Sequence, residues 1–223
     1  MLSDHVRPKL NGLTRADSLA FDFHKWLHVN YDAGCVLIRD AQAHRHAFAD
    51  RPEYLAPATE GLAAANPWPV DFGPELSRGF RALKIWAHLL EHGTKKLGAS
   101  ITRNCEQAQY LTTKINETKN LELMAPTSLN ITNFRVAPPD HSDLDALNAA
   151  IVTELQTTGI AAPSTTRLNG NLAIRANITN HRTTTDDLDI LLEATQNIAN
   201  SLRISENTSA GGSQPPKTRP ASN

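Results

Sequence analysis

The sequence contains few cysteines, no excess charge of one sign and no long apolar segment, and each absence excludes a class of protein. Only two of its 223 residues are cysteines, and Cys35 and Cys105 lack the spacing of metal ligands. The formal net charge is −1, so we expect neither nucleic acid nor an anionic membrane surface as a partner. The longest apolar runs, such as GCVLI and IWAHLL, are far shorter than the roughly 20 residues that span a bilayer.

Other absences narrow the range of proteins further. The N-terminal segment MLSDHVRPKLNG lacks an apolar stretch, so we expect no signal peptide, and the two cysteines predict reduced thiols in a cytoplasmic protein. His44 and His46 flank Arg45 without an evident third ligand, so we expect no metal site. No glycine-rich loop follows a strand pattern, which argues against a dinucleotide-binding or phosphate-binding α/β protein.

The first half of the sequence mixes strand, loop and helix patterns. Alternating apolar residues predict strands over 18–23 and 35–40. Segment 41–74 contains five prolines, so we expect a long loop there rather than a helix or a central strand. Long loops in compact domains are often functional. Two helices are expected next, over 76–93 and 94–116.

The second half alternates strands and helices, which is the pattern of a small α/β sandwich. The expected strands and helices are strands over 121–124, 129–137 and 171–178, a helix N-capped by Ser142 and ending at Gly159, and a helix over 184–202. We therefore predict one domain over residues 1–116 and a small α/β domain over 117–204. Residues 205–223 are polar and rich in Gly, Pro and Ser, which predicts a disordered tail.

One lysine, in ADSLAFDFHKW, lies directly after one strand pattern and before another. Burial between strands would lower its pKa, because desolvation disfavours the ammonium, and a free amine forms imines with carbonyl compounds. In the alternative, the stem of Lys25 lies along apolar surface and its charged end remains in water. Spacing alone favours this alternative, since lysines are rarely buried.

Three segments, ADSLAFDFHKW, GCVLIRD and LSRGFRALKIW, together resemble the group II pyridoxal-phosphate-dependent amino acid decarboxylases, a family that includes aromatic-L-amino-acid, histidine and glutamate decarboxylases. The resemblance extends from about Lys9 to about Ala199, and LSRGFRALKIW is nearer to the aromatic branch. It implies the C-terminal part of a fold-type I transferase dependent on pyridoxal 5′-phosphate (PLP), with the end of the large domain followed by a small α/β sandwich domain.

The resemblance also implies a site and a reaction. Lys25 is expected to hold PLP as an internal aldimine, and His24 to contact the cofactor near its phosphate. Tyr54, in the long loop, is expected to protonate the substrate carbon across a dimer interface, acting as a general acid. Alternatively, Tyr54 is a loop tyrosine with a packed ring and a hydrated hydroxyl. The implied substrate is an L-amino acid, with an aromatic one favoured, and the implied assembly is a homodimer.

Part of the family pattern has no counterpart in the sequence. The complete chains of the family are longer on the N-terminal side, where the remaining cofactor contacts are expected. We therefore expect a fragment, with a non-catalytic remnant or one half of a split enzyme as alternatives. Two further sets of residues stay open: Arg81 and Lys84 either contact a carboxylate or form a solvated face, and Arg175 either has a structural role or reaches a substrate carboxylate.

Overall fold

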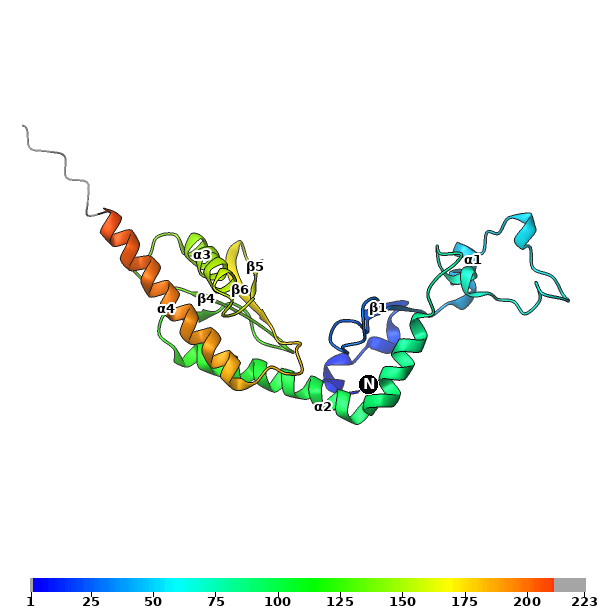
Figure 1. Ribbon diagram of the computed structural model, residues 1–223, viewed down its shortest axis with the longest axis horizontal. Coiled ribbons are helices and arrows are strands. Elements are labelled where there is room, and N and C mark those ends of the chain that lie inside the picture. Colours follow the sequence, from blue (N-terminus) through cyan, green and yellow to red (C-terminus); the bar gives the residue numbers. More distant parts are fainter. Residues whose placement is uncertain (1, 211–223) are drawn as a thin grey trace, which may run out of the picture. The chain divides into compact units, whose positions relative to one another are not determined.

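The computed structural model describes residues 2–210 of the chain (Figure 1). The chain divides into two compact units, Met1–Ala99 and Ser100–Asn223, and each is described by itself. This division falls before the boundary expected near residue 116, because the second half of helix α2 (Arg81–Glu117) packs into the core of the second unit. The assignment of residues 1–116 to one domain of a larger protein stays a prediction.

The second unit is a four-stranded antiparallel sheet covered by helices, and Figure 1 shows α3 and α4 lying against it. The strand order is β3-β4-β6-β5. Its elements after α2 are β3 (Leu121–Leu123), β4 (Ile131–Val136), α3 (Leu144–Thr157), β5 (Ser164–Leu168), β6 (Asn171–Asn177) and α4 (Thr185–Ala210). The expected strand–helix alternation is therefore present, with the addition of β5, whose polar sequence STTRL carries no apolar alternation.

A single apolar core holds this unit together. Alternate residues of β4 are buried, so that Phe134 and Val136 face the helices. They lie in one cluster with Leu111 of α2, Ile151 of α3 and Leu191 of α4. Full burial of a side chain of this size stabilises the folded state by about 1.5–3 kcal/mol. The helices are thus fixed to one face of the sheet by packing.

Two neighbouring aspartates organise the start of α3. The N-cap is Asp143, whose side chain accepts a hydrogen bond from the Ala146 N–H, and not Ser142 as expected. Asp145 instead accepts the Leu172 N–H at 2.9 Å and pairs with Arg167 at 2.7 Å. Both contacts lower the pKa of Asp145, and the hydrogen bond from Leu172 has the larger effect. They also tie the β5–β6 hairpin to the first turn of the helix.

The first unit is built on a β-hairpin and helical turns. Strands β1 (Ser18–Asp22) and β2 (Gly34–Ile38) pair antiparallel, with Asp22 opposite Gly34. The remaining elements are η1 (Arg7–Leu10), η2 (Leu13–Arg15), α1 (Ala41–Phe48), η3 (Glu53–Leu55), η4 (Pro69–Phe72) and the first part of α2. Gly93 interrupts α2 with φ 70° and ψ 157°, as expected for a glycine that ends one helix before the next begins.

The expected long loop is more ordered than its prolines indicated. Residues 41–48 form α1, because the prolines begin only after it and Asp40 caps it, accepting from Gln42 N and Ala43 N. The next helix begins at Arg81 rather than near residue 76. At the other end of the chain α4 continues to Ala210, so residues 205–210 of the predicted tail are helical. The rest of that tail lies outside the described residues.

Candidate active site

The loop between β1 and β2 carries Lys25 and is closed by backbone hydrogen bonds. The Phe23 N–H donates to the Ala33 carbonyl at 2.9 Å, and the Val29 N–H donates to the Phe23 carbonyl at 3.1 Å. A third bond, from the His28 N–H to the Lys25 carbonyl at 3.1 Å, forms a turn directly after the lysine. The side chain of Lys25 therefore leaves a fixed backbone, and 71% of it is exposed.

The charge of Lys25 is set by one carboxylate. Its Nζ lies 2.5 Å from Oδ2 of Asp22, three residues earlier at the end of β1. This hydrogen bond, together with the negative charge of Asp22, raises the pKa of the Lys25 amine. The same contact lowers the pKa of Asp22. The structure thus shows the opposite of the lysine with a lowered pKa that burial between strands would produce.

The adjacent His24 is held on two sides. Its Nδ1 accepts a hydrogen bond from the Ala33 N–H at 2.9 Å, so in the neutral ring the proton lies on Nε2. The ring of Tyr31 packs edge-on against it, with centroids 4.7 Å apart and planes at 70°. Nε2 lies 3.9 Å from Oδ1 of Asp22, on the same side as the lysine pair. Sequence reasoning identified His24 and Lys25 and favoured a local anchoring role for Asp22, but it missed Tyr31 as a neighbour of the histidine.

The end of this loop is attached to the first part of α2. Nε of Arg81 lies 3.0 Å from Asp32, and Nζ of Lys84 lies 3.9 Å from the same carboxylate. Arg81 also pairs with Glu75 at 3.2 Å. The hydrogen bond from Arg81 lowers the pKa of Asp32. Both basic residues therefore contact carboxylates of their own unit.

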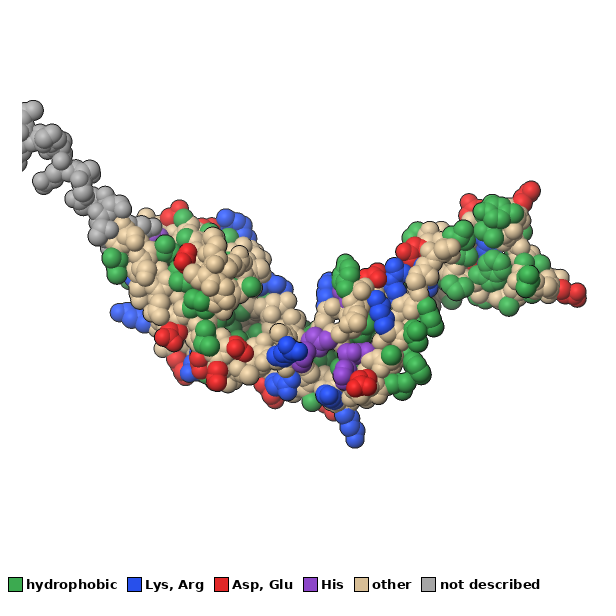
Figure 2. All heavy atoms as spheres, in the orientation of Figure 1, with side chains coloured by type: hydrophobic (Ala, Val, Ile, Leu, Met, Phe, Trp, Pro, Cys, Tyr) green, Lys and Arg blue, Asp and Glu red, His purple; other side chains and the backbone are tan. Residues whose placement is uncertain are grey.

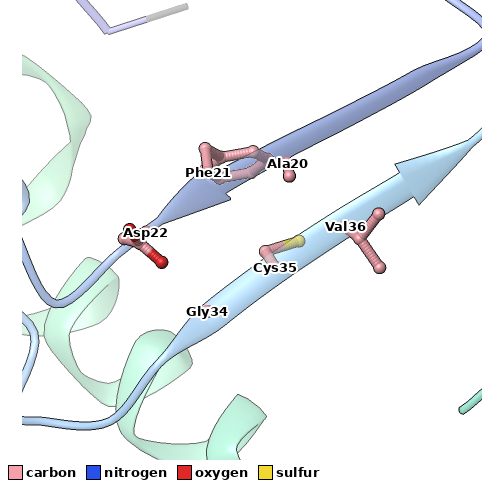
Figure 3. A pocket seen from close by; sticks show the side chains of 6 residues that line it. All are labelled: Ala20, Phe21, Asp22, Gly34, Cys35 and Val36. Carbon is pink, nitrogen blue, oxygen red and sulfur yellow. The ribbon is translucent and has the colours of Figure 1, made fainter.

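Beside the lysine loop, the β1–β2 hairpin encloses an open hollow of about 390 Å³ (Figure 3). It is lined by Ala20, Phe21, Asp22, Gly34, Cys35 and Val36. Cys35 is partly buried, and burial raises the pKa of its thiol. Figure 3 shows Asp22 where β1 ends, opposite the start of β2. All residues that line the hollow belong to the two strands of the hairpin, so the hollow is open on its other sides.

Tyr54 lies on η3, in the segment between α1 and η4, and is 80% exposed. Among the described residues, no hydrogen bond, ion pair or ring contact joins it to Lys25 or His24. Its segment is organised around Asp71, a fully buried carboxylate that forms a short ion pair with Arg51. Arg51 also donates to the Leu55 carbonyl at 3.4 Å, directly beside Tyr54.

Further contacts of Arg51 close the same segment. Its guanidinium donates to the Asn66 side-chain oxygen at 3.0 Å and lies 4.5 Å from the centre of the Trp68 ring. The hydrogen bond from Arg51 lowers the pKa of Asp71. The backbone N–H of Trp68 donates to Oδ2 of Asp71 at 3.0 Å. One buried ion pair thus joins the turn that carries Tyr54 to η4.

The remaining candidates lie elsewhere. Arg175 is in β6 of the second unit, opposite Asn133 in the sheet register and partly exposed. His44 and His46 lie in α1, where His44 contacts the Phe72 carbonyl at 3.0 Å. Within residues 2–210, no group of three or more His, Cys, Asp or Glu side chains is placed to hold a metal ion. No helix in that range combines the length and apolarity needed to cross a membrane.

The first part of α2 carries an exposed apolar stripe, and Figure 2 shows hydrophobic side chains along it. Leu83, Trp86 and Leu90 lie at helical spacing and are 52%, 60% and 65% exposed. Phe80, just before the helix, is 76% exposed. Contiguous exposed apolar surface of this kind is typical of interaction surfaces.

Comparisons with known proteins agree on one family. The family model described as the pyridoxal-dependent decarboxylase conserved domain matches residues 1–137. An aromatic-L-amino-acid decarboxylase of Bacillus atrophaeus is 33% identical over 211 residues, covering 92% of this chain and 43% of that protein. A histidine decarboxylase of Drosophila melanogaster is 33% identical over 185 residues, covering 82% of this chain and 20% of that protein.

A solved structure adds the fold. The structure of Oryza sativa TDC with PLP and tryptamine matches with a TM-score of 0.81 and 22% sequence identity, covering 90% of this chain and 42% of that chain. At this identity the likeness concerns the fold alone. The present chain spans less than half the length of each of these relatives.

Proposed function

Because the chain belongs to the pyridoxal-dependent decarboxylase family, we propose that it supplies the lysine half of a site for PLP-dependent decarboxylation of an L-amino acid. The observation that carries this proposal is the exposed Lys25 amine beside His24, on a closed loop within the matched segment. In this proposal residues 1–116 are the end of the cofactor-binding domain and residues 117–204 the small C-terminal domain.

The chemistry of these two residues fits the cofactor. The Lys25 side chain is 71% exposed, so its amine is accessible to an aldehyde and, once deprotonated, can condense with it and release water. His24 carries its proton on Nε2 when neutral, since Nδ1 accepts from Ala33, and an N–H at that position donates to a phosphate oxygen. Lys25 and His24 are therefore the residues of this chain that would hold PLP.

Bound PLP supplies an electron sink for the pair of electrons left when carbon dioxide departs. The residues of this chain act around it. Lys25 anchors the cofactor, and its amine must first lose the proton that the contact with Asp22 stabilises. His24 orients the phosphate end. Tyr54 donates a proton to the substrate carbon, provided that its exposed segment meets the site in the complete assembly.

The choice of substrate and assembly is also a proposal. The Bacillus atrophaeus relative is an aromatic-L-amino-acid decarboxylase, which supports an aromatic substrate, whereas the Drosophila relative is a histidine decarboxylase. We favour the aromatic class, a homodimeric complete enzyme and a cytoplasmic location.

The rest of the pocket is proposed to come from polypeptide that this chain does not contain. The hollow beside Lys25 has walls only along the hairpin, and the stripe of Leu83, Trp86 and Leu90 is exposed. Both features suit a chain that covers less than half of its relatives. The alternatives are one half of a split enzyme, which would use the same stripe to bind its other half, and a non-catalytic remnant.

Reductive trapping tests the anchor. The chain is incubated with PLP, treated with borohydride and mapped by mass spectrometry. We expect one adduct, on Lys25, and its loss in Lys25→Arg. Adducts spread equally over the surface lysines, unchanged by Lys25→Arg, would contradict a specific anchor. Carbon dioxide release is then measured for the PLP-loaded chain with aromatic amino acids and with histidine as substrates. Release would indicate an enzyme, and its absence would indicate a non-catalytic remnant.

A further inference from the structure

Tyr31 lies in the turn before β2 and has no role in the proposal so far. It is 85% exposed, so its burial contributes little to folding. Its described ring contact is with His24, at 4.7 Å between centroids and 70° between planes. Edge-on aromatic pairs of this geometry are attractive beyond the area they bury. The contact therefore acts mainly on the histidine.

Two independent contacts determine how His24 is presented. The Ala33 N–H occupies Nδ1 and sets the tautomer, while the ring of Tyr31 limits rotation of the imidazole. The atom left available is Nε2, on the side of Asp22 and Lys25. The exposed ring of Tyr31 thus contacts the histidine that directly precedes Lys25 in the sequence.

We propose that Tyr31 is a positioning residue, whose ring holds His24 so that its Nε2–H faces the phosphate of an aldehyde-bearing phosphate ester attached at Lys25. This inference rests on the proposed function, because it assigns the ligand of His24 from it. The hydroxyl is not required, since the contact with His24 is made by the ring. Tyr31→Phe should therefore keep His24 in place, whereas Tyr31→Ala should not.

The first arm of the test needs no cofactor. Imidazole NMR signals of His24, assigned with His24→Gln, are compared in the unaltered chain, Tyr31→Ala, Tyr31→Phe and Phe80→Ala. Phe80 is the matched control, an exposed aromatic of the same unit. We expect the His24 ring signals to move in Tyr31→Ala alone. Unchanged signals in Tyr31→Ala would overturn the inference.

The second arm measures the concentration of PLP that half-saturates borohydride trapping at Lys25. We expect it to rise roughly two- to tenfold in Tyr31→Ala, the size of one aromatic contact, and to stay unchanged in Tyr31→Phe and Phe80→Ala. Equal loss in Tyr31→Phe would assign the effect to the hydroxyl and overturn the role of the ring. Absence of specific trapping in the unaltered chain would contradict the proposed function, while the NMR arm still decides whether Tyr31 holds His24.

Discussion

The Lys25 side chain favours its ammonium form, and the contact with Asp22 is the main reason. The 2.5 Å contact places a full negative charge against an exposed amine, so the pKa of that amine lies above its ordinary value. At neutral pH the free amine, which is the form that attacks an aldehyde, is correspondingly scarce. If PLP attaches at Lys25 as proposed, Asp22 is expected to slow the attachment, and a ligand that displaces or neutralises Asp22 is expected to speed it.

Replacing Asp22 with asparagine should make Lys25 more reactive. The pKa of the amine falls when the carboxylate is removed, and the free-amine fraction at fixed pH rises about tenfold for each unit of that fall. We expect faster PLP trapping at pH 7 and a rate–pH curve displaced toward lower pH. Rates followed by mass spectrometry between pH 6 and pH 10 check this. Asp4→Asn, which removes another aspartate paired three residues along the chain, is the control; equal acceleration there would contradict the explanation.

At the scale of elements, the segment that carries Tyr54 is held by one buried ion pair. Arg51 joins η3 to η4 through Asp71, Asn66 and the Leu55 carbonyl. Without Arg51, the buried Asp71 keeps only the more exposed Arg45, 3.6 Å away, as a cationic partner, and this costs more than the lost bond. The segment should therefore open as a unit when either partner is changed.

Arg51→Met should loosen the turn around Tyr54. The side chain keeps much of its length but loses the charge and every donor, so Asp71 loses its main partner. We expect cleavage by chymotrypsin after Tyr54 to accelerate by roughly tenfold, which corresponds to the loss of one charge-assisted hydrogen bond. Arg78→Met, at an exposed arginine of the same unit, should leave the rate unchanged. If Arg51→Met is cleaved no faster than the unaltered chain and Arg78→Met, then the prolines, and not the ion pair, hold the segment.

At the scale of the whole chain, stability is unequally distributed. The large core cluster lies wholly in the second unit. In the first unit the buried apolar residues are fewer: Val6, Val29, Ala33 and Leu97. All three tryptophans, Trp26, Trp68 and Trp86, lie in the first unit, so their fluorescence reports on it alone.

Leu111→Ala and Leu83→Ala, two changes in the same helix, should have different consequences. Leu111 is fully buried, and its truncation should lower the free energy of unfolding of the second unit by about 2–5 kcal/mol. Leu83 is half-exposed, so its truncation should cost less than about 0.5 kcal/mol. Urea unfolding followed by circular dichroism should show the loss for Leu111→Ala, with the tryptophan transition unmoved. A shift of both signals would mean that the two units unfold together.

The sequence predicted the parts of the chain that depend on local pattern and on family motifs. The comparisons confirm the family and the fold class. The strand pair around Lys25 and the helix break at Gly93 follow from alternation and from glycine geometry. The roles of Lys25, His24 and Tyr54 stay predictions.

Features that depend on folding in three dimensions were missed. β5 has no apolar alternation, because it lies at the edge of its sheet beside β6. The Asp71 ion pair joins residues 20 apart across prolines that indicated an unstructured loop. Asp22 and Tyr31 are near Lys25 in the sequence, but only the closed loop shows which of their atoms meet.

Gly93 has a consequence for cooperativity. Helical hydrogen bonding couples each turn to the next, so fraying in one part of a continuous helix weakens the part beside it. The φ of 70° at Gly93 interrupts that coupling between the exposed first part of α2 and the part that continues into the second unit. Fraying of the first part, which carries the apolar stripe, therefore does not propagate along the helix backbone into the second part. Gly93 thus separates the stability of the exposed apolar stripe from that of the core.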